Sequence, residues 1–465
     1  MKSDLTPHQN GDRMERVPKQ PKYAKSRHGL VRKGTRTLAG AILLLSTATA
    51  GLVSQHVTGN VEAAAVAAPT ESGTIVVDWN KALVQAVSTP GVQPATIHPT
   101  RSFAILHTAM YDAIVSITHS SAPYLFSLNT VAGARPDAAA AEAGHDTLAA
   151  LYPSLTGTFD QQLASELGAI PDGAAKQRGI EAGRLAASFM LAARSNDRSS
   201  TPPPPAPAGT QPGAYRPTPP FVAPGVFTQW PGVTPFVLND ANQFQPAPPP
   251  SLNSAAYSQA INQVKSLGAV NSTTRTAEQT TIARFWSPPI WVTWNQIAEN
   301  SALAHHTDLV HTARLFALLN LSFADTTIAM YDAKYQYNLW WPVTAIREAG
   351  TVGNSAVIAD PNWAPLLNAS DPSYPGAHSA ISGAGAAVLT SVFGTHDKIK
   401  VTSSLLPGVV RTFKSYNAAA TEAGMSRIYA GVHTELDHVS GIRLGRQVAG
   451  FVLHQAGSHT FGLTR

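Results

Sequence analysis

Apolar residues at helical spacing dominate this chain on both sides of one proline-dense segment. Alanine-rich stretches at residues 138–151 and 174–193 favour helix by intrinsic propensity. No segment alternates apolar and polar residues as a half-buried strand does. The sequence therefore predicts an all-α fold, a helical bundle of about ten helices. The clearest helical spacing in the N-terminal part is that of Phe103, Leu106, Met110, Ile114 and Ile117.

The same spacing resumes after residue 251 and predicts a second set of helices. These segments contain too many polar residues, and too many interruptions, to cross a membrane as helices. The sequence shows no evident internal repeat. The expected helices span residues 255–267, 276–286, about 302–334, 379–393, about 409–430 and 433–456.

Between the two sets of helices, residues 201–251 are dense in proline, glycine and aromatic side chains. Proline fixes φ and removes a backbone donor, which excludes a helix or a central strand here. We predict an ordered crossover at the rim of the site, within a single helical domain of residues 69–465. A flexible linker is the alternative. The aromatic anchors would be Tyr215, Phe221, Phe227, Trp230, Phe236 and Phe244.

The positive charge of the chain is concentrated at its N-terminus. Residues 1–37 hold ten Lys or Arg and three Asp or Glu, and the rest is close to neutral. The basic balance is therefore no sign of nucleic-acid binding. An uncharged apolar stretch and small residues follow, so residues 1–68 are predicted to be an export signal of a secreted or extracytoplasmic protein. An uncleaved N-terminal membrane anchor is the alternative.

Three separated stretches in the last third of the chain combine the side chains that bind a tetrahedral oxyanion. A lysine and an arginine neutralise its oxygens, and backbone N–H groups at a turn of small residues donate hydrogen bonds. Two histidines supply a ligand or nucleophile and a proton donor. In chain order the stretches are Lys334 with Trp341-Pro342, Pro375-Gly376-Ala377-His378, and Ser426-Arg427 with His433, followed by Asp437.

In order and spacing, these stretches resemble the three-part signature shared by vanadium-dependent haloperoxidases and type-2 phosphatidic acid phosphatases. That signature runs Lys, six residues, Arg-Pro; then Pro-Ser-Gly-His; then Ser-Arg, five residues, His. The third part matches fully, whereas Trp341 stands at the arginine of the first part and Gly376-Ala377 replaces Ser-Gly in the second. Residues 101–112 and 313–319 resemble the soluble, chloroperoxidase-like bacterial branch.

The resemblance implies a vanadate cofactor and a role for each matched residue. His433, expected in the first turn of the last helix, would be the vanadate ligand or a phosphohistidine-forming nucleophile. Asp437, four residues further on, would orient its ring. His378 would be the acid–base group. His438 is expected on the polar surface.

The remaining matched positions would surround the oxygens of the anion. Lys334 and Arg427 would supply positive charge, and the turn at Gly376 and Ala377 would supply backbone N–H groups. Trp341 offers one indole N–H where the signature has a guanidinium.

Three functions are compatible with these residues. The first is a haloperoxidase that oxidises halide with hydrogen peroxide. The second is an acid phosphatase that cleaves a phosphoester through a phosphohistidine. The third is a non-catalytic family member whose site has decayed, because Trp341 lacks the charge of arginine. The chain has no phosphate loop, dinucleotide fingerprint or nucleophile elbow.

Overall fold

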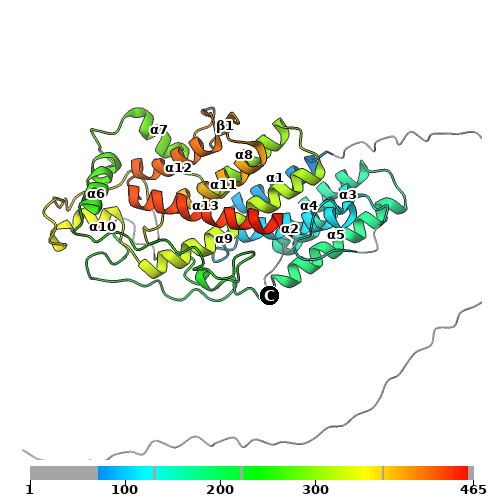
Figure 1. Cartoon of the computed structure of the whole chain (residues 1–465), viewed down its shortest axis with the longest axis horizontal. Coiled ribbons are helices and arrows are strands. Elements are labelled where there is room, and N and C mark those ends of the chain that lie inside the picture. Colours follow the sequence, from blue (N-terminus) through cyan, green and yellow to red (C-terminus); the bar gives the residue numbers. More distant parts are fainter. Residues whose placement is uncertain (1–71, 129–131, 220–223, 369–370, 459–465) are drawn as a thin grey trace, which may run out of the picture. The chain divides into compact units, whose positions relative to one another are not determined.

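The computed structural model describes residues 72–128, 132–219, 224–368 and 371–458 (Figure 1). The predicted export signal over residues 1–68 lies outside these residues. The described residues contain thirteen α-helices and one two-stranded sheet, so the predicted all-α fold is confirmed. The helices are α1 (Thr74–Ser88), α2 (Pro99–Thr118), α3 (Pro136–Leu151), α4 (Thr156–Gly168), α5 (Ala174–Ala193), α6 (Ala255–Gly268), α7 (Ala277–Phe285), α8 (Ile290–Ala304), α9 (Leu309–Tyr337), α10 (Pro342–Arg347), α11 (Ala377–Phe393), α12 (Tyr416–Tyr429) and α13 (Glu435–Gly457).

The small sheet has one strand, β2, in a region where the sequence predicted helix. Strand β1 (Ile399–Thr402) pairs antiparallel with β2 (Val410–Phe413), with Ile399 opposite Phe413. The expected helix over residues 409–430 is therefore wrong in its first residues. Helix α12 begins only after Ser415, whose side chain accepts a hydrogen bond from the N–H of Ala418 at 3.2 Å. None of the described helices is both long and apolar enough to span a membrane.

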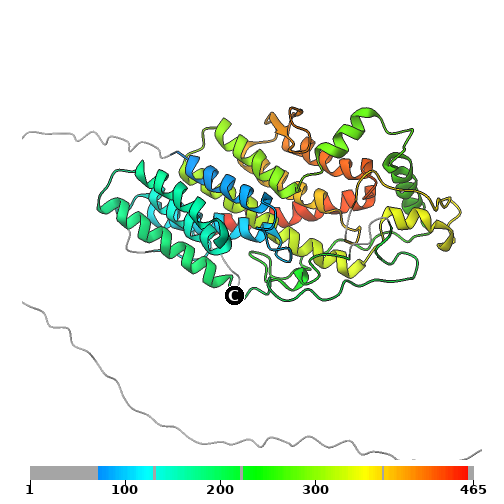
Figure 2. The same ribbon diagram turned by 180° about the vertical axis from the view of Figure 1, so that it is seen from behind.

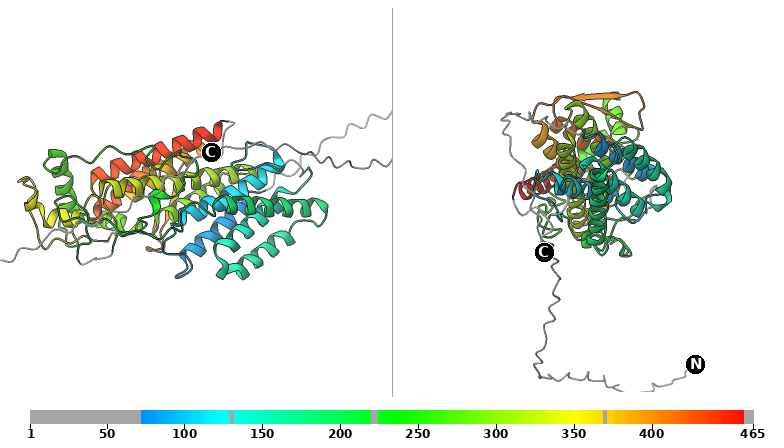
Figure 3. Two further views of the ribbon diagram at one scale, coloured as in Figure 1. Left: turned by 90° about the horizontal axis from the view of Figure 1, so that it is seen from below. Right: turned by 90° about the vertical axis from the view of Figure 1, so that its right-hand side faces the viewer.

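Two bundles, α1–α2–α3–α5 and α8–α9–α11–α13, contain the same buried pattern. A Trp-Asn pair begins it, Trp79-Asn80 in α1 and Trp294-Asn295 in α8. A Cβ on Gly144 of α3 would lie 2.6 Å from the Trp79 ring, and one on Gly385 of α11 would lie 2.8 Å from the Trp294 ring. In Figure 3 the long helices of both bundles run roughly parallel or antiparallel to one another.

The second helix of each bundle repeats the pattern Arg-x-Phe-Ala-x-Leu, at residues 101–106 of α2 and 314–319 of α9. In both helices a buried aspartate follows six residues after the leucine, Asp112 in α2 and Asp325 in α9. The carboxylate of Asp112 accepts the backbone N–H groups of residues 124–126 at 2.6, 2.8 and 3.3 Å. The carboxylate of Asp325 accepts those of residues 236–238 at 2.6, 2.7 and 2.8 Å. Each aspartate therefore fixes a loop to its bundle.

The last helix of each bundle carries the pattern Gly-Ile-x-x-Gly-Arg-x-x-Ala-x-Phe-x-Leu, at residues 179–191 and 441–453. Its second glycine lies against backbone: a Cβ would be 2.4 Å from the Ala139 oxygen at Gly183, and 1.8 Å from the Ala380 oxygen at Gly445. The chain thus contains an internal repeat, and the expectation that it has none is wrong. Figures 1 and 2 show the first bundle in blue to teal and the second in yellow-green to red.

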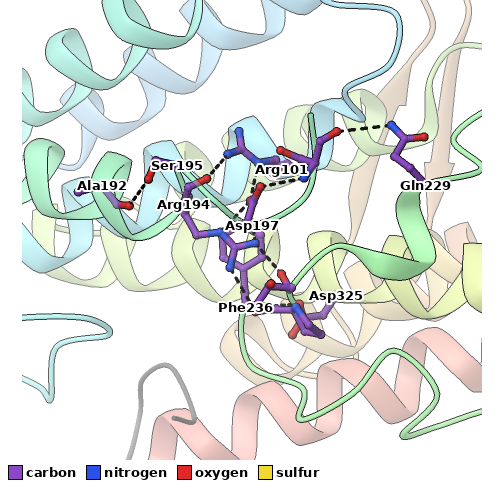
Figure 4. Close-up of polar contacts among 11 residues, drawn as sticks. Arg101, Ala192, Arg194, Ser195, Asp197, Gln229, Phe236 and Asp325 are labelled. Atoms are coloured by element: carbon purple, nitrogen blue, oxygen red, sulfur yellow. Dashed lines mark hydrogen bonds and ion pairs between the residues drawn. The ribbon is translucent and has the colours of Figure 1, made fainter. Parts of the chain in front are cut away.

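The proline-rich crossover between the bundles is attached by buried polar contacts (Figure 4). Besides the bonds to Asp325, the Arg194 guanidinium donates to the carbonyl of Thr234 at 2.6 Å and lies 3.7 Å from the centre of the Phe236 ring. Asp197 pairs with Arg194 at 3.0 Å. Further along, the N–H of Tyr215 donates to the carbonyl of Asn338 at 2.7 Å. The crossover therefore runs from the first bundle to the segment that follows α9.

Candidate functional site

The matched motif residues meet where the second bundle is covered by α12, which packs on α6, α7 and α11. The charges of Lys334 and Arg427 contribute to the lowered pKa values of both His378 and His433, so the four side chains belong to one cluster. They come from the last turn of α9 (Lys334), the start of α11 (Gly376, Ala377, His378), the last turn of α12 (Arg427), the loop before α13 (His433) and its first turn (Asp437).

Arg427 carries the clearest mark of an anion site. Its side chain is buried, and Nε and Nη1 have no hydrogen-bond partner among the described residues. Burial lowers the pKa of Arg427 to about 10, although the negative charge of Asp371 acts to raise it. Buried donors of a charged group are destabilising unless they are paired. Two donors of this buried guanidinium therefore lack an acceptor among the described residues, which makes Arg427 a candidate ligand for a bound anion.

Lys334 is fully buried, and the segment at residues 371–373 occupies its ammonium group. Its Nζ donates to the carbonyls of Pro372 and Ser373 and pairs with Oδ2 of Asp371 at 3.1 Å. An ammonium group has three N–H donors, so these contacts use all of them. Lys334 supplies positive charge to the cluster, as expected, but its donors hold the loop ahead of α11.

His433 lies in the loop between α12 and α13, two residues ahead of Glu435, and not in the first turn of the last helix as expected. Its Nδ1 is 3.6 Å from Oδ2 of Asp437 and 3.4 Å from the Ser373 hydroxyl. A proton on Nδ1 facing the carboxylate leaves the lone pair on Nε2. Burial lowers the pKa of His433, and the positive charges of Lys334 and Arg427 lower it further, whereas Asp437 acts to raise it. The neutral ring can serve as a ligand or nucleophile.

Asp437 is fixed by contacts that hold it ionised beside His433. Its Oδ2 accepts the N–H of Thr434 at 2.6 Å in a capping box and the Ser373 hydroxyl at 2.8 Å. Burial alone would raise the pKa of Asp437, but His433, Thr434 and Ser373 outweigh it and the pKa is lowered. The predicted proximity of Asp437 to His433 thus arises from a helix cap and a neighbouring loop.

His378 is half-buried, and its Nε2 is 3.0 Å from the carbonyl of Trp286. A carbonyl only accepts, so Nε2 carries the proton and Nδ1 the lone pair. Burial holds the pKa of His378 well below its usual value, and Arg427 and His433 lower it further. At neutral pH this side chain is an uncharged base.

Gly376 joins the start of α11 to α13. Its N–H donates to the carbonyl of Asp437 at 3.0 Å, and a Cβ at this position would lie 3.1 Å from that oxygen. The N–H of Gly376 is therefore engaged, which differs from the expectation that it faces the anion. The N–H groups of Ala377 and His378 open the helix and have no intrahelical acceptor, so they are the backbone donors at this turn.

Trp341 is 4% exposed and packs in an apolar cluster with Tyr215, Trp340 and Val343. Its indole N–H donates to the backbone carbonyl of Asp371. At this position, where the family signature has a guanidinium, the chain has an apolar wall that fixes the neighbouring loop.

Sequence reasoning missed three residues of the cluster. Asp371 and Ser373 stand just ahead of the second motif, and that adjacency was the only signal for them. His438 is 7% exposed, and its Nδ1 is 2.9 Å from the hydroxyl of Ser379, so its expected place on the surface is wrong.

A cavity of about 560 Å³ adjoins the first turns of α13. It lies between that helix, Tyr374 and the crossover, whose Ala247 carbonyl accepts the Tyr374 hydroxyl at 2.7 Å. Leu436 and Val439 form its apolar side, and Arg443 adds a charge. The cavity therefore offers room for an organic molecule next to the residues that flank His433.

Comparison with known proteins points in the same direction. A family model described as the VCPO second helical-bundle domain matches residues 314–462. The vanadium chloroperoxidase of Curvularia inaequalis is 29% identical over 175 residues, a match that covers 30% of this chain and 28% of that protein. The chain thus matches less than a third of the length of this curated relative.

Two solved structures share the fold. The first bacterial vanadium-dependent iodoperoxidase superposes with a TM-score of 0.69 at 24% identity, covering 82% of this chain and 96% of that one. A holo-type bacterial vanadium-dependent chloroperoxidase gives a TM-score of 0.64 at 15% identity, covering 85% of this chain and 100% of that one. The two structures show that the fold is shared. The family-model match over residues 314–462 and the curated relative, together with the three-part motif, support the superfamily of vanadium-dependent haloperoxidases and type-2 phosphatidic acid phosphatases.

Proposed function

We propose that the cluster binds vanadate and that the protein is a vanadium-dependent haloperoxidase-like enzyme, which oxidises halide with hydrogen peroxide. The observation that carries the proposal is the buried Arg427 guanidinium, whose Nε and Nη1 have no partner, beside two histidines with lowered pKa values. The activities of the related enzymes support the same function.

The residues present fit a tetrahedral oxyanion. Nε2 of His433 would be its ligand, Arg427 would bind its oxygens through the two unpaired nitrogens, and the first N–H groups of α11 would donate to it. When bound, vanadate supplies the Lewis acidity that activates peroxide toward halide.

The protein groups around that position would move protons and hold charge. Nδ1 of His378, with the lone pair, would take a proton from hydrogen peroxide and return it to the leaving oxygen. Asp437 would keep the His433 ring in the tautomer that presents Nε2. Lys334 would add positive charge from behind the 371–373 loop, which it holds in place.

The test couples binding to turnover. Orthovanadate is titrated into the full chain, and halogenation of a phenolic trap is then followed with peroxide and chloride, bromide or iodide. Wild type should bind vanadate and halogenate with at least one halide, and His433→Ala should do neither. His454→Ala, at the far end of α13, is the matched control and should behave as wild type. Vanadate binding without turnover on any halide would reject the peroxidase, and no binding would indicate a non-catalytic family member.

A phosphatase is the second candidate, because the same tautomer of His433 suits attack on phosphorus. His378 would then protonate the leaving oxygen. Hydrolysis of an aryl phosphate that vanadate inhibits, and that is lost in His433→Ala, would support this function. Hydrolysis that survives the substitution would exclude His433 as the nucleophile.

A further inference from the structure

A carboxylate lies inside the cluster of cations. Oδ2 of Asp371 is 3.1 Å from Nζ of Lys334. Burial lowers the pKa of Arg427, and the charge of Asp371 is near enough to oppose that lowering. The family signature does not include this residue. An acidic side chain beside an anion site weakens anion binding unless the anion can donate a hydrogen bond to it.

Two neighbours hold Asp371 in this place. The indole N–H of the buried Trp341 donates to its backbone carbonyl, and Lys334 binds both its carboxylate and the carbonyl of Ser373. Because the Trp341 and Lys334 side chains are buried, the Asp371 carboxylate is held at Lys334, within electrostatic range of Arg427. Trp341, which replaces the arginine of the signature, therefore helps to hold the Asp371 carboxylate in place.

The chemistry of a carboxylate separates oxyanions by their protons. An ionised carboxylate is only an acceptor, so it binds an oxyanion oxygen that carries hydrogen and repels one that presents lone pairs. Phosphate and vanadate keep a proton at neutral pH, whereas sulfate has none. We propose that Asp371 makes the pocket selective for protonated tetrahedral oxyanions and excludes sulfate. This inference rests on the proposed oxyanion site and identifies the residue that sets its ligand specificity.

The experiment compares phosphate, orthovanadate and sulfate by calorimetric titration at neutral pH, using the full chain. Asp371→Asn keeps the shape and the backbone carbonyl, and its amide N–H can donate to a fully deprotonated oxygen. The matched control is Asp308→Asn, at the other end of α9, where asparagine caps a helix as well as aspartate does. Circular dichroism checks that each variant is folded.

Wild type and Asp308→Asn should bind phosphate and vanadate at least about tenfold more tightly than sulfate. In Asp371→Asn that ratio should fall by roughly tenfold to a hundredfold, chiefly because sulfate binds better. Equal binding of sulfate and phosphate by wild type would overturn the inference, as would an Asp371→Asn effect of the same size on all three anions. If none of the anions binds wild type, the proposed function itself fails.

Discussion

The two bundles of this chain share a buried framework and differ in what they add to it. Both contain the Trp-Asn pair, the aspartate that fixes a loop and the closely packed glycine. Seven residues before the tryptophan-contacting glycine, the first bundle has Asp137 and the second has His378. Asp137 pairs with Arg135 at 2.9 Å. Helix α2 has 20 residues and α9 has 29, and the last turn of the longer helix carries Lys334.

Comparing the two bundles identifies structural residues that a shifted pKa alone would suggest are functional. Burial raises the pKa of Asp112 to about 7 and that of Asp325 to about 6, which is typical of functional acids. Both, however, perform the same loop-fixing task in the two bundles. The proposed oxyanion-binding side chains are not repeated in this way, since Asp137 stands at the position of His378 and α2 ends before the position that corresponds to Lys334. The repetition therefore assigns Asp112 and Asp325 to the framework of the bundles.

Removing either loop-fixing carboxylate should have the largest effect on stability. Asp112→Ala and Asp325→Ala each leave three backbone N–H groups without their acceptor. Each should lower the free energy of unfolding by roughly 3–5 kcal/mol, measured by urea denaturation. A loss below about 1 kcal/mol in only one of the two variants would break the equivalence of the bundles.

Adding a methyl group at the repeated glycine should have the next largest effect. Gly445→Ala, with a Cβ 1.8 Å from the Ala380 oxygen, should be more destabilising than Gly183→Ala, where the distance to the Ala139 oxygen is 2.4 Å. We expect about 3 kcal/mol and about 2 kcal/mol, respectively, from thermal unfolding. Gly450→Ala, with nothing within 4 Å, is the control and should stabilise by up to about 1 kcal/mol. A smaller loss of stability in Gly445→Ala than in Gly183→Ala would show that α13 moves away from α11 at little cost.

The smallest effect concerns a buried pair at which the bundles differ chemically. Nε2 of His107 is 2.7 Å from Oδ1 of Asn80, whereas the second bundle pairs Asn320 with Asn295 at 3.0 Å. Burial lowers the pKa of His107 to about 3, so below pH 6.5 the unfolded chain takes up a proton that the folded chain does not. Stability contributed by the neutral ring is therefore lost as the pH falls.

His107→Asn should remove that part of the acid sensitivity. Between pH 6.5 and pH 5 the wild type should lose about 1.6 kcal/mol more unfolding free energy than the variant, measured by urea denaturation at both pH values. His98, whose pKa burial also lowers to about 3, remains in both proteins as an internal reference. Identical pH profiles would show that His107 is protonated in the folded state.

The sequence predicted what local patterns determine. The spacing of Phe103, Leu106 and Met110 identified α2, because one residue in three or four faces the core. The third motif located Arg427 and His433, since a short stretch contains both. The bond from Gly376 to the Asp437 carbonyl depends on how α11 packs on α13 and has no sequence signal of its own. The repeat was missed because its matching residues are few and are spread over four helices with unequal connections.

The central claim is that the chain has one oxyanion site, built in the second bundle on the unpaired nitrogens of Arg427. Calorimetric titration of orthovanadate into wild type and Arg427→Met tests it most directly. Wild type should show one site per chain, and Arg427→Met should weaken it by about tenfold to a hundredfold or more. Because Nε and Nη1 have no protein partner, the same variant should unfold at no lower urea concentration than wild type. Two sites per chain, or unchanged affinity in Arg427→Met, would contradict the account.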